Sequence, residues 1–209
     1  MTDLSVRHEP IEGPSAWVGR NIRAEDYRVE LASASLDEIH RAVDEMRAYP
    51  LPTIVLRPED FTMPACRQQM ARVRHILDHG VRFAIVDRLP VAELDAGEAT
   101  AVYWLLSSMV SRPVAQKLDG ALIYDVLDTG QEALPGSGVR PDKTNIEIRF
   151  HNDNAYNNTP PDYVGLLCWR QAVSGGHSRT AFADHSEPDR KRHLVRLWMR
   201  DRGRRAYPG

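Results

Sequence analysis

Hydrophobic residues recur at helical spacing in the first half of the chain. The first run follows a capping-box pattern of Ser35 and Glu38 and stops at YPLP (49–52). A second run begins near Pro64 and ends at Gly80, where a helix cap in the left-handed conformation is expected. The pattern therefore predicts two amphipathic helices before residue 80.

A strand and a third helix are predicted next. The apolar stretch VRFAIVD (81–87) is typical of a strand. Asp95 and Glu98 form another capping box, and the apolar residues after them continue up to Arg112-Pro113. The stretch YWLLSSMV within this run is far shorter than a membrane span, so we interpret it as part of a buried helix.

The second half has the texture of short strands. After a loop rich in turn residues (128–141), NIEIRFH (145–151) alternates apolar and polar positions. DYVGLLCW (162–169) is more continuously apolar, and RHLVRLWMR (192–200) is best read as a strand because of its length. We expect one α+β domain over 1–209, with a helix-rich front part (1–113) and a β-rich back part (114–209) that carries the chemistry.

Composition narrows the classes of partner. Hydrophobic residues make up 42% of the 209 residues, and the net charge of -2 provides no field that would attract nucleic acid or an anionic membrane. The two cysteines form no CxxC pair, and the first ten residues are polar. We therefore expect a cytoplasmic protein with no nucleic-acid or membrane partner.

A candidate metal-binding pair stands at the end of the alternating strand. Residues two apart in a strand point the same way, so His151 and Asp153 would face one surface. One imidazole and one carboxylate are two-thirds of a facial triad for Fe(II). An HxD triplet is common by chance, so its context has to support the assignment.

That context resembles a known family. FHNDNAYNNTPPDYVGLLCWRQAVSGGHS (150–178) is similar to the iron-binding half of the TauD/TfdA family of Fe(II)- and 2-oxoglutarate-dependent dioxygenases. The matches are the His151-x-Asp153 pair, the Thr159-Pro160-Pro161 turn and the Gly175-Gly176-x-Ser178 end, and the front half is also similar. The resemblance implies a double-stranded β-helix, a cupin-like jelly roll, with helices packed outside it.

The resemblance also implies a set of site residues. His151, Asp153 and His177 would bind iron, and Ser178, Arg192 and Arg196 would hold 2-oxoglutarate or face the substrate. Arginine suits a carboxylate because its planar fork donates two parallel hydrogen bonds. Dioxygen would be the second cosubstrate, succinate and CO2 would be released, and no catalytic side chain is expected beyond the metal site. His185 and His193 are weaker alternatives for the third ligand.

Two family motifs overlap at SGGHSRTAF (174–182). His177 and Ser178 belong both to the upstream motif and to the downstream segment, which the family separates by several strands. Those strands would need roughly 40 residues, so we expect an incomplete jelly roll. An alternative is an inactive relative that binds a partner or self-associates through open strand edges. A cupin-like protein that uses zinc or manganese is a third hypothesis.

Overall fold

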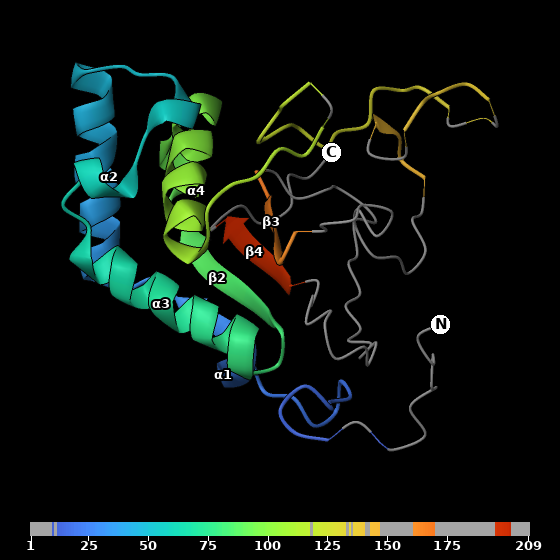
Figure 1. The fold of residues 1–209 in the computed structure, drawn as a ribbon. Helices are drawn as coiled ribbons and strands as arrows, with labels where there is room; N and C mark the ends of the chain where they lie inside the picture. The colour runs from blue at the N-terminus through green and yellow to red at the C-terminus, as the bar shows by residue number, and fades with distance from the viewer. Residues whose placement is uncertain are drawn as a thin grey trace, which may run out of the picture.

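The computed structural model describes residues 10, 12–117, 119–132, 134, 136–140, 143–146, 161–169 and 195–201, the last range for its backbone. Helices gather on one side of the molecule and strands lie beside them (Figure 1). The described helices are α1 (Ala24–Tyr27), α2 (Ser33–Ala48), α3 (Pro64–His79) and α4 (Ala96–Val110), with short 3-10 turns at Thr53–Val55, Pro58–Asp60 and Val91–Glu93. The described strands are β1 (Arg28–Glu30), β2 (Phe83–Leu89), β3 (Tyr163–Leu167) and β4 (Val195–Asp201).

The first helix is confirmed, but its predicted capping box is wrong. α2 begins at Ser33, two residues before Ser35, which is buried inside the helix. Glu38 accepts hydrogen bonds from the backbone N–H groups of Ala65 and Cys66, at 2.9 and 2.8 Å. These are donors in the first turn of α3 that no intrahelical carbonyl can satisfy. Glu38 therefore caps another helix and ties α2 to α3.

Gly80 ends α3 as predicted, although for a different reason. Its φ is -98°, so the left-handed conformation expected there is wrong. A Cβ at Gly80 would lie 2.8 Å from the carbonyl oxygen of Ile76, the oxygen that accepts the Gly80 N–H at 2.9 Å. The residue with positive φ is Arg82, at 69°. Glycine is required at position 80 by close backbone approach.

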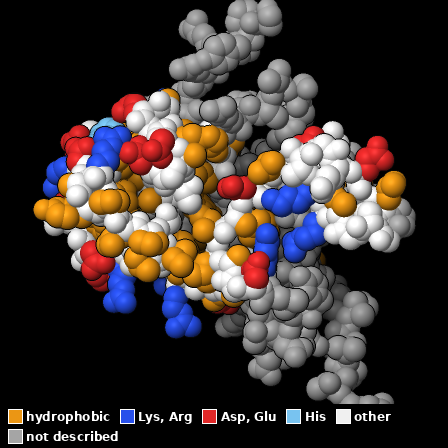
Figure 2. All heavy atoms as spheres, turned by 90° about the horizontal axis from the view of Figure 1, so that it is seen from above, with side chains coloured by type: hydrophobic (Ala, Val, Ile, Leu, Met, Phe, Trp, Pro, Cys, Tyr) orange, Lys and Arg blue, Asp and Glu red, His pale blue; other side chains and the backbone are white. Residues whose placement is uncertain are grey.

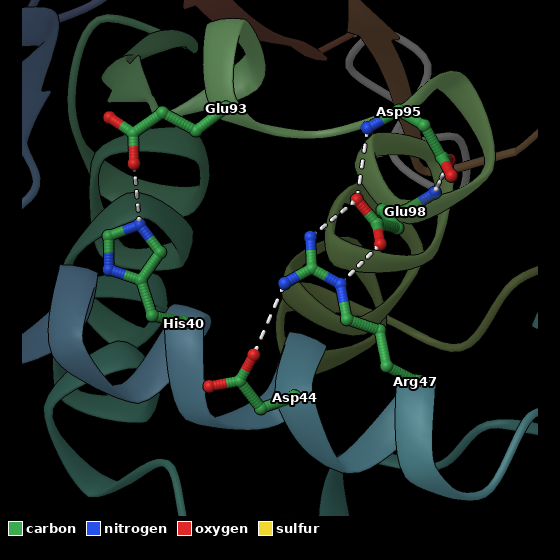
Figure 3. A network of polar contacts seen from close by, with 6 residues as sticks. All are labelled: His40, Asp44, Arg47, Glu93, Asp95 and Glu98. Atoms are coloured by element: carbon green, nitrogen blue, oxygen red, sulfur yellow. Dashed lines mark hydrogen bonds and ion pairs between the residues drawn. The ribbon is translucent and has the colours of Figure 1, made fainter.

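The capping box of α4 is confirmed. The Asp95 carboxylate accepts the Glu98 N–H at 2.8 Å, and the Glu98 carboxylate accepts the Asp95 N–H at 3.0 Å. Glu98 also accepts two hydrogen bonds from the Arg47 guanidinium of α2, at 2.7 and 3.2 Å (Figure 3). Asp44 contacts the same guanidinium, and His40 and Glu93 form a neighbouring pair at 3.2 Å. This network joins the end of α2 to the start of α4.

The strands form one sheet in the order β1-β2-β4-β3. Each neighbouring pair among these described strands runs parallel. β4 lies between β2 and β3 although it follows β3 in sequence. The sheet is therefore held together by pairing between strands that lie far apart in the sequence. A jelly roll is built mainly from antiparallel strands, and none of the pairs among the described strands has that direction.

The core lies between one face of the sheet and the long helices. Its fully buried large side chains come from β1, β2, α2, α3, α4 and the connections between them: Val29, Ile39, Val43, Met63, Met70, Val73, Leu77, Val86, Leu89, Leu105 and Leu106. Burial of each such side chain contributes about 2 kcal/mol relative to exposure. The helical periodicity in the sequence therefore corresponds to real burial.

The described residues combine helices with few strands, which agrees with the α+β expectation. None of the described helices is both long and apolar enough to cross a membrane. On the face shown in Figure 2, acidic and basic side chains are intermixed among hydrophobic ones.

Candidate active site

The two faces of the sheet differ in what covers them. In β2, Ala84 and Val86 are fully buried. The residues that precede each of them, Phe83 and Ile85, are half-buried. In β1, Val29 is fully buried between Arg28 and Glu30. Because side chains alternate along a strand, Val29, Ala84 and Val86 face the helices. In the described part of the chain, the opposite face carries Phe83 and Ile85 and is turned away from the long helices α2, α3 and α4.

β3 is fixed to the helical layer at two points. The Tyr163 hydroxyl donates a hydrogen bond to the Asp78 carboxylate of α3 at 2.5 Å. Gly165 lies so close to the Tyr103 hydroxyl of α4 that a Cβ could not be accommodated without a shift. By alternation, Val164 and its neighbour Leu166 are turned to the opposite face. The predicted strand 162–169 is confirmed, but it is half-buried rather than fully buried.

β4 brings one predicted site residue into a defined register. The Cα of Arg196 pairs with Phe83 of β2 and with Val164 of β3. Both partners lie on the face opposite the helices. Arg196 is thus held at a central position of the sheet by strands from both halves of the chain.

A charged cluster marks the carboxyl ends of β1 and β2. The Arg28 guanidinium contacts the Glu30 carboxylate at 2.8 Å and the Asp87 carboxylate at 2.5 Å, and Arg88 lies 3.5 Å from Asp87. The Asp87 side chain is 8% exposed, and a small hollow adjoins it, lined by Glu30, Leu31, Asp87 and Arg88. Arg28 and Arg88 balance the negative charge of the Asp87 carboxylate through ion pairs. Asp87 is therefore not available as a metal ligand. This cluster was not predicted from the sequence, where its signal is the Asp87-Arg88 pair inside an apolar strand.

Aromatic side chains gather at the amino end of β2. Phe83 stacks on Tyr27 with ring centres 4.8 Å apart and meets Trp17 at 5.3 Å. The Trp17 indole N–H donates a hydrogen bond to the Val81 carbonyl at 2.9 Å. The N-terminal segment is thereby attached beside the register position of Arg196. This aromatic cluster was not predicted either, because its members lie far apart in the sequence.

Cys66 has no reactive role in this arrangement. It is buried, and its thiol donates a hydrogen bond to the Ser35 carbonyl at 3.4 Å. Burial, reinforced by the neighbouring Glu38 carboxylate, raises the pKa of the Cys66 thiol to about 12. The thiolate is the form that attacks electrophiles and binds metals, so Cys66 is inert at neutral pH.

Most of the predicted site residues lie outside the described residues. These are His151, Asp153, His177, Ser178 and Arg192, together with the alternatives His185 and His193. Arg196 is described for its backbone alone. Within the described ranges, no group of three or more His, Cys, Asp or Glu side chains could hold a metal ion. The predicted ligand set therefore stays a prediction.

Comparison with known proteins identifies the family. The family model "Taurine catabolism dioxygenase TauD, TfdA family" matches residues 47–185, which is more than half of the 209 residues. The chain therefore belongs to the TauD/TfdA family, a family of dioxygenase-type enzymes. The matched stretch includes the positions of His151, Asp153, His177 and Ser178 and ends before Arg192.

A curated relative points the same way. The FR-33289 synthase of Streptomyces rubellomurinus is 24% identical to the chain over 183 residues. The similarity covers 87% of this chain and 52% of the relative. The chain thus spans about half the length of this relative.

Proposed function

We propose that the chain is an Fe(II)- and 2-oxoglutarate-dependent dioxygenase that oxidises a small organic substrate and releases succinate and CO2. The observation that carries the proposal is the family match over 47–185, because this stretch contains the His151-x-Asp153 pair and His177 in family order. The similarity to the FR-33289 synthase supports the same class of enzyme.

The chemistry of the proposed ligand set fits Fe(II). His151 and His177 would each supply an imidazole nitrogen, and Asp153 would supply a carboxylate oxygen. Two imidazoles and one carboxylate are the donors of a facial triad, which leaves positions for a cosubstrate. Bound Fe(II) supplies the oxidising chemistry together with 2-oxoglutarate and dioxygen. The role of the three side chains is to hold the metal on one side and leave the other side accessible.

We propose that Ser178, Arg192 and Arg196 bind the cosubstrate. A guanidinium meets a carboxylate with two parallel charge-assisted hydrogen bonds, and a serine hydroxyl adds a further donor. The register of β4 supports a role for Arg196, since its partners Phe83 and Val164 lie on the face away from the helices. Alternation would send the Arg196 side chain to that same face.

The fold proposed for the whole chain is a single domain over 1–209 with an incomplete jelly-roll core. The helices of the first half would pack outside this core, as α2, α3 and α4 pack on the described sheet (Figure 1). Membership of the family supports the jelly roll. We further propose a cytoplasmic setting, in keeping with a sequence that holds two cysteines and no CxxC pair, and a small-molecule partner rather than nucleic acid or a membrane.

Anaerobic titration tests the activity. Folded protein receives Fe(II) and then 2-oxoglutarate, and the visible charge-transfer band of the ternary complex is recorded. We expect the band in the unaltered protein and its loss in Asp153→Asn, which keeps the shape of the side chain and removes its charge. His40→Ala, on the surface of α2, is the matched control and should keep the band. Absence of the band in folded, iron-loaded protein would reject the proposal.

The arginine assignments are tested by the same titration. Arg192→Lys keeps the charge but loses the planar fork, so more 2-oxoglutarate should be needed to reach half of the maximal band. Arg196→Lys should do the same if Arg196 faces the cosubstrate. A titration unchanged in both variants would remove both residues from the site.

A second candidate is an inactive relative that binds a partner or self-associates. It is favoured by the overlap of two motifs at 174–182, which leaves no room for the strands that the family places between them. Size-exclusion chromatography and amide hydrogen exchange distinguish the two candidates. Slow, cooperative exchange over 142–209 supports the enzyme, whereas rapid exchange there together with self-association supports the inactive relative. A third candidate is a cupin-like protein that uses zinc or manganese. Elemental analysis of the purified protein would reveal either metal in place of iron.

A further inference from the structure

Two histidines lie one turn apart on the exposed surface of α3. His75 and His79 are both exposed, and their ring centres are 5.2 Å apart with the planes inclined at 52°. Residues four apart in a helix lie on the same face, one above the other. The helix is 16 residues long, and its opposite face is buried in the core. The two rings therefore project from a rigid support.

The spacing of the rings suits a single metal ion. A metal bound about 2.1 Å from one nitrogen of each ring, at a tetrahedral angle, brings the two ring centres to about 5 Å from each other. This agrees with the 5.2 Å between the His75 and His79 rings. Little rearrangement is therefore needed for both imidazoles to bind the same ion.

We propose that His75 and His79 form a second metal site, which binds a borderline divalent transition metal such as Zn²⁺, Ni²⁺ or Cu²⁺. Imidazole is a preferred ligand of these ions. Within the described part of the chain no third His, Cys, Asp or Glu completes the group, so the proposed protein ligands are the two imidazoles. Binding is accordingly weaker than at a closed structural site. The proposal does not depend on the dioxygenase function.

The position of the pair on the helix favours a cation. His79 is the last residue of α3, where the carbonyl groups of the last turn carry a partial negative charge. The same field holds the Arg82 guanidinium, which donates hydrogen bonds to the carbonyl groups of Leu77 and Asp78. Arg72, exposed one turn before His75, opposes a bound cation. Replacement of Arg72 by alanine should therefore tighten metal binding.

Calorimetric titration with Zn²⁺ tests the site. The protein is the untagged full chain carrying His151→Ala and Asp153→Asn, so that the proposed iron centre keeps a single imidazole. We expect a binding event that is lost in His75→Ala and in His79→Ala. His40→Ala is the control, because His40 lies on α2 with Leu36 and Asp44 at the positions four residues away. Alanine is favourable at exposed helix positions, so the alanine variants should stay folded. Circular dichroism should confirm this.

A rescue variant separates a chelating pair from a general effect of histidine. Ala71 is exposed four residues before His75. In His79→Ala, the added change Ala71→His recreates a pair with the same spacing, and Zn²⁺ binding and retention on immobilised Ni²⁺ should return. The proposal is overturned if His75→Ala and His79→Ala bind Zn²⁺ as the parent protein does. It is also overturned if the pair recreated at positions 71 and 75 fails to restore binding in a folded variant.

Discussion

The Tyr163 hydroxyl of β3 donates a hydrogen bond to the Asp78 carboxylate of α3, 85 residues earlier in the chain, at 2.5 Å. Arg74 lies 3.4 Å from the other oxygen of the same carboxylate. β3 begins ten residues after Asp153, the proposed iron ligand. This hydrogen bond therefore fixes the strand that follows the proposed ligand pair to the helical layer.

Tyr163→Phe should destabilise the protein by about 2 kcal/mol, the usual contribution of a hydrogen bond to a charged group. The ring would still pack, and the change isolates the hydroxyl. The free energy of unfolding is measured with urea near neutral pH. Tyr49→Phe is the matched control, since Tyr49 is 80% exposed and should be neutral. Equal stability of both variants would show that the Tyr163 hydrogen bond contributes nothing.

The same pair should make stability depend on alkaline pH. Burial, and then the Asp78 carboxylate, raise the pKa of Tyr163 from 10.0 to about 12. A group whose pKa is raised on folding stabilises the folded state fully below its unfolded pKa and loses that effect as pH rises through the folded pKa. The difference in unfolding free energy between the parent protein and Tyr163→Phe should therefore shrink from pH 10 towards pH 12. A constant difference across this range would contradict the assignment.

Helices could be predicted from the sequence because the spacing of their hydrophobic residues is a local property of the chain. Asp95 and Glu98 form the predicted box because both side chains are free to turn to the helix end. The analogous capping pattern of Ser35 and Glu38 gave a wrong prediction, because both side chains form hydrogen bonds with α3 instead. A capping pattern is thus a local signal that a neighbouring helix can override.

Strand pairing could not be predicted in this way. β4 inserts between β2 and β3, and nothing in the local pattern of RHLVRLWMR specifies β2, more than a hundred residues earlier, as a partner. The Arg28–Asp87 pair was missed for the same reason, since it depends on the register of β1 and β2. The proposed ligands His151 and Asp153 were identified from spacing and resemblance, and they stay predictions.

Cys66 should resist thiol reagents in the folded protein. Its pKa is raised to about 12 by burial and by Glu38, so almost no thiolate exists at neutral pH. The variant Cys168→Ser leaves Cys66 as the one thiol, and its reaction with a disulfide reagent is followed by absorbance. We expect reaction at the rate of unfolding in buffer and immediate reaction in urea. Rapid reaction in buffer would mean that the α2–α3 contact opens readily.

Asp95→Ala should lower stability by about 1 kcal/mol through loss of the helix cap. The Glu98 N–H loses its acceptor, and Glu98 is left to the Arg47 contact (Figure 3). Asp95→Asn keeps an oxygen that can accept the same N–H and is the matched control, with most of the stability retained. Thermal unfolding of the three proteins measures the effect. An Asn variant as unstable as the Ala variant would point to charge, rather than the cap, as the source of stability.

Gly165→Ala should destabilise the packing of β3 on α4. The added methyl group would meet the Tyr103 hydroxyl, whereas the next ring atoms, Cζ and Cε2, lie at 3.4 and 3.7 Å. Overpacking of this kind costs about 2 kcal/mol. Gly19→Ala is the control, because no atom lies within 4 Å of its Cβ position.

Tyr103→Phe should suppress the defect of Gly165→Ala, because removal of the hydroxyl leaves the methyl group at ordinary contact distance from the ring. The double variant should then be more stable than Gly165→Ala alone, and the difference measured through a double-mutant cycle is the energy of this one contact. Urea unfolding of the four proteins provides the cycle. Additive effects would mean that β3 shifts away from α4 to make room, and the strand after the proposed iron ligands would then be less firmly held than the close approach of Gly165 to Tyr103 implies.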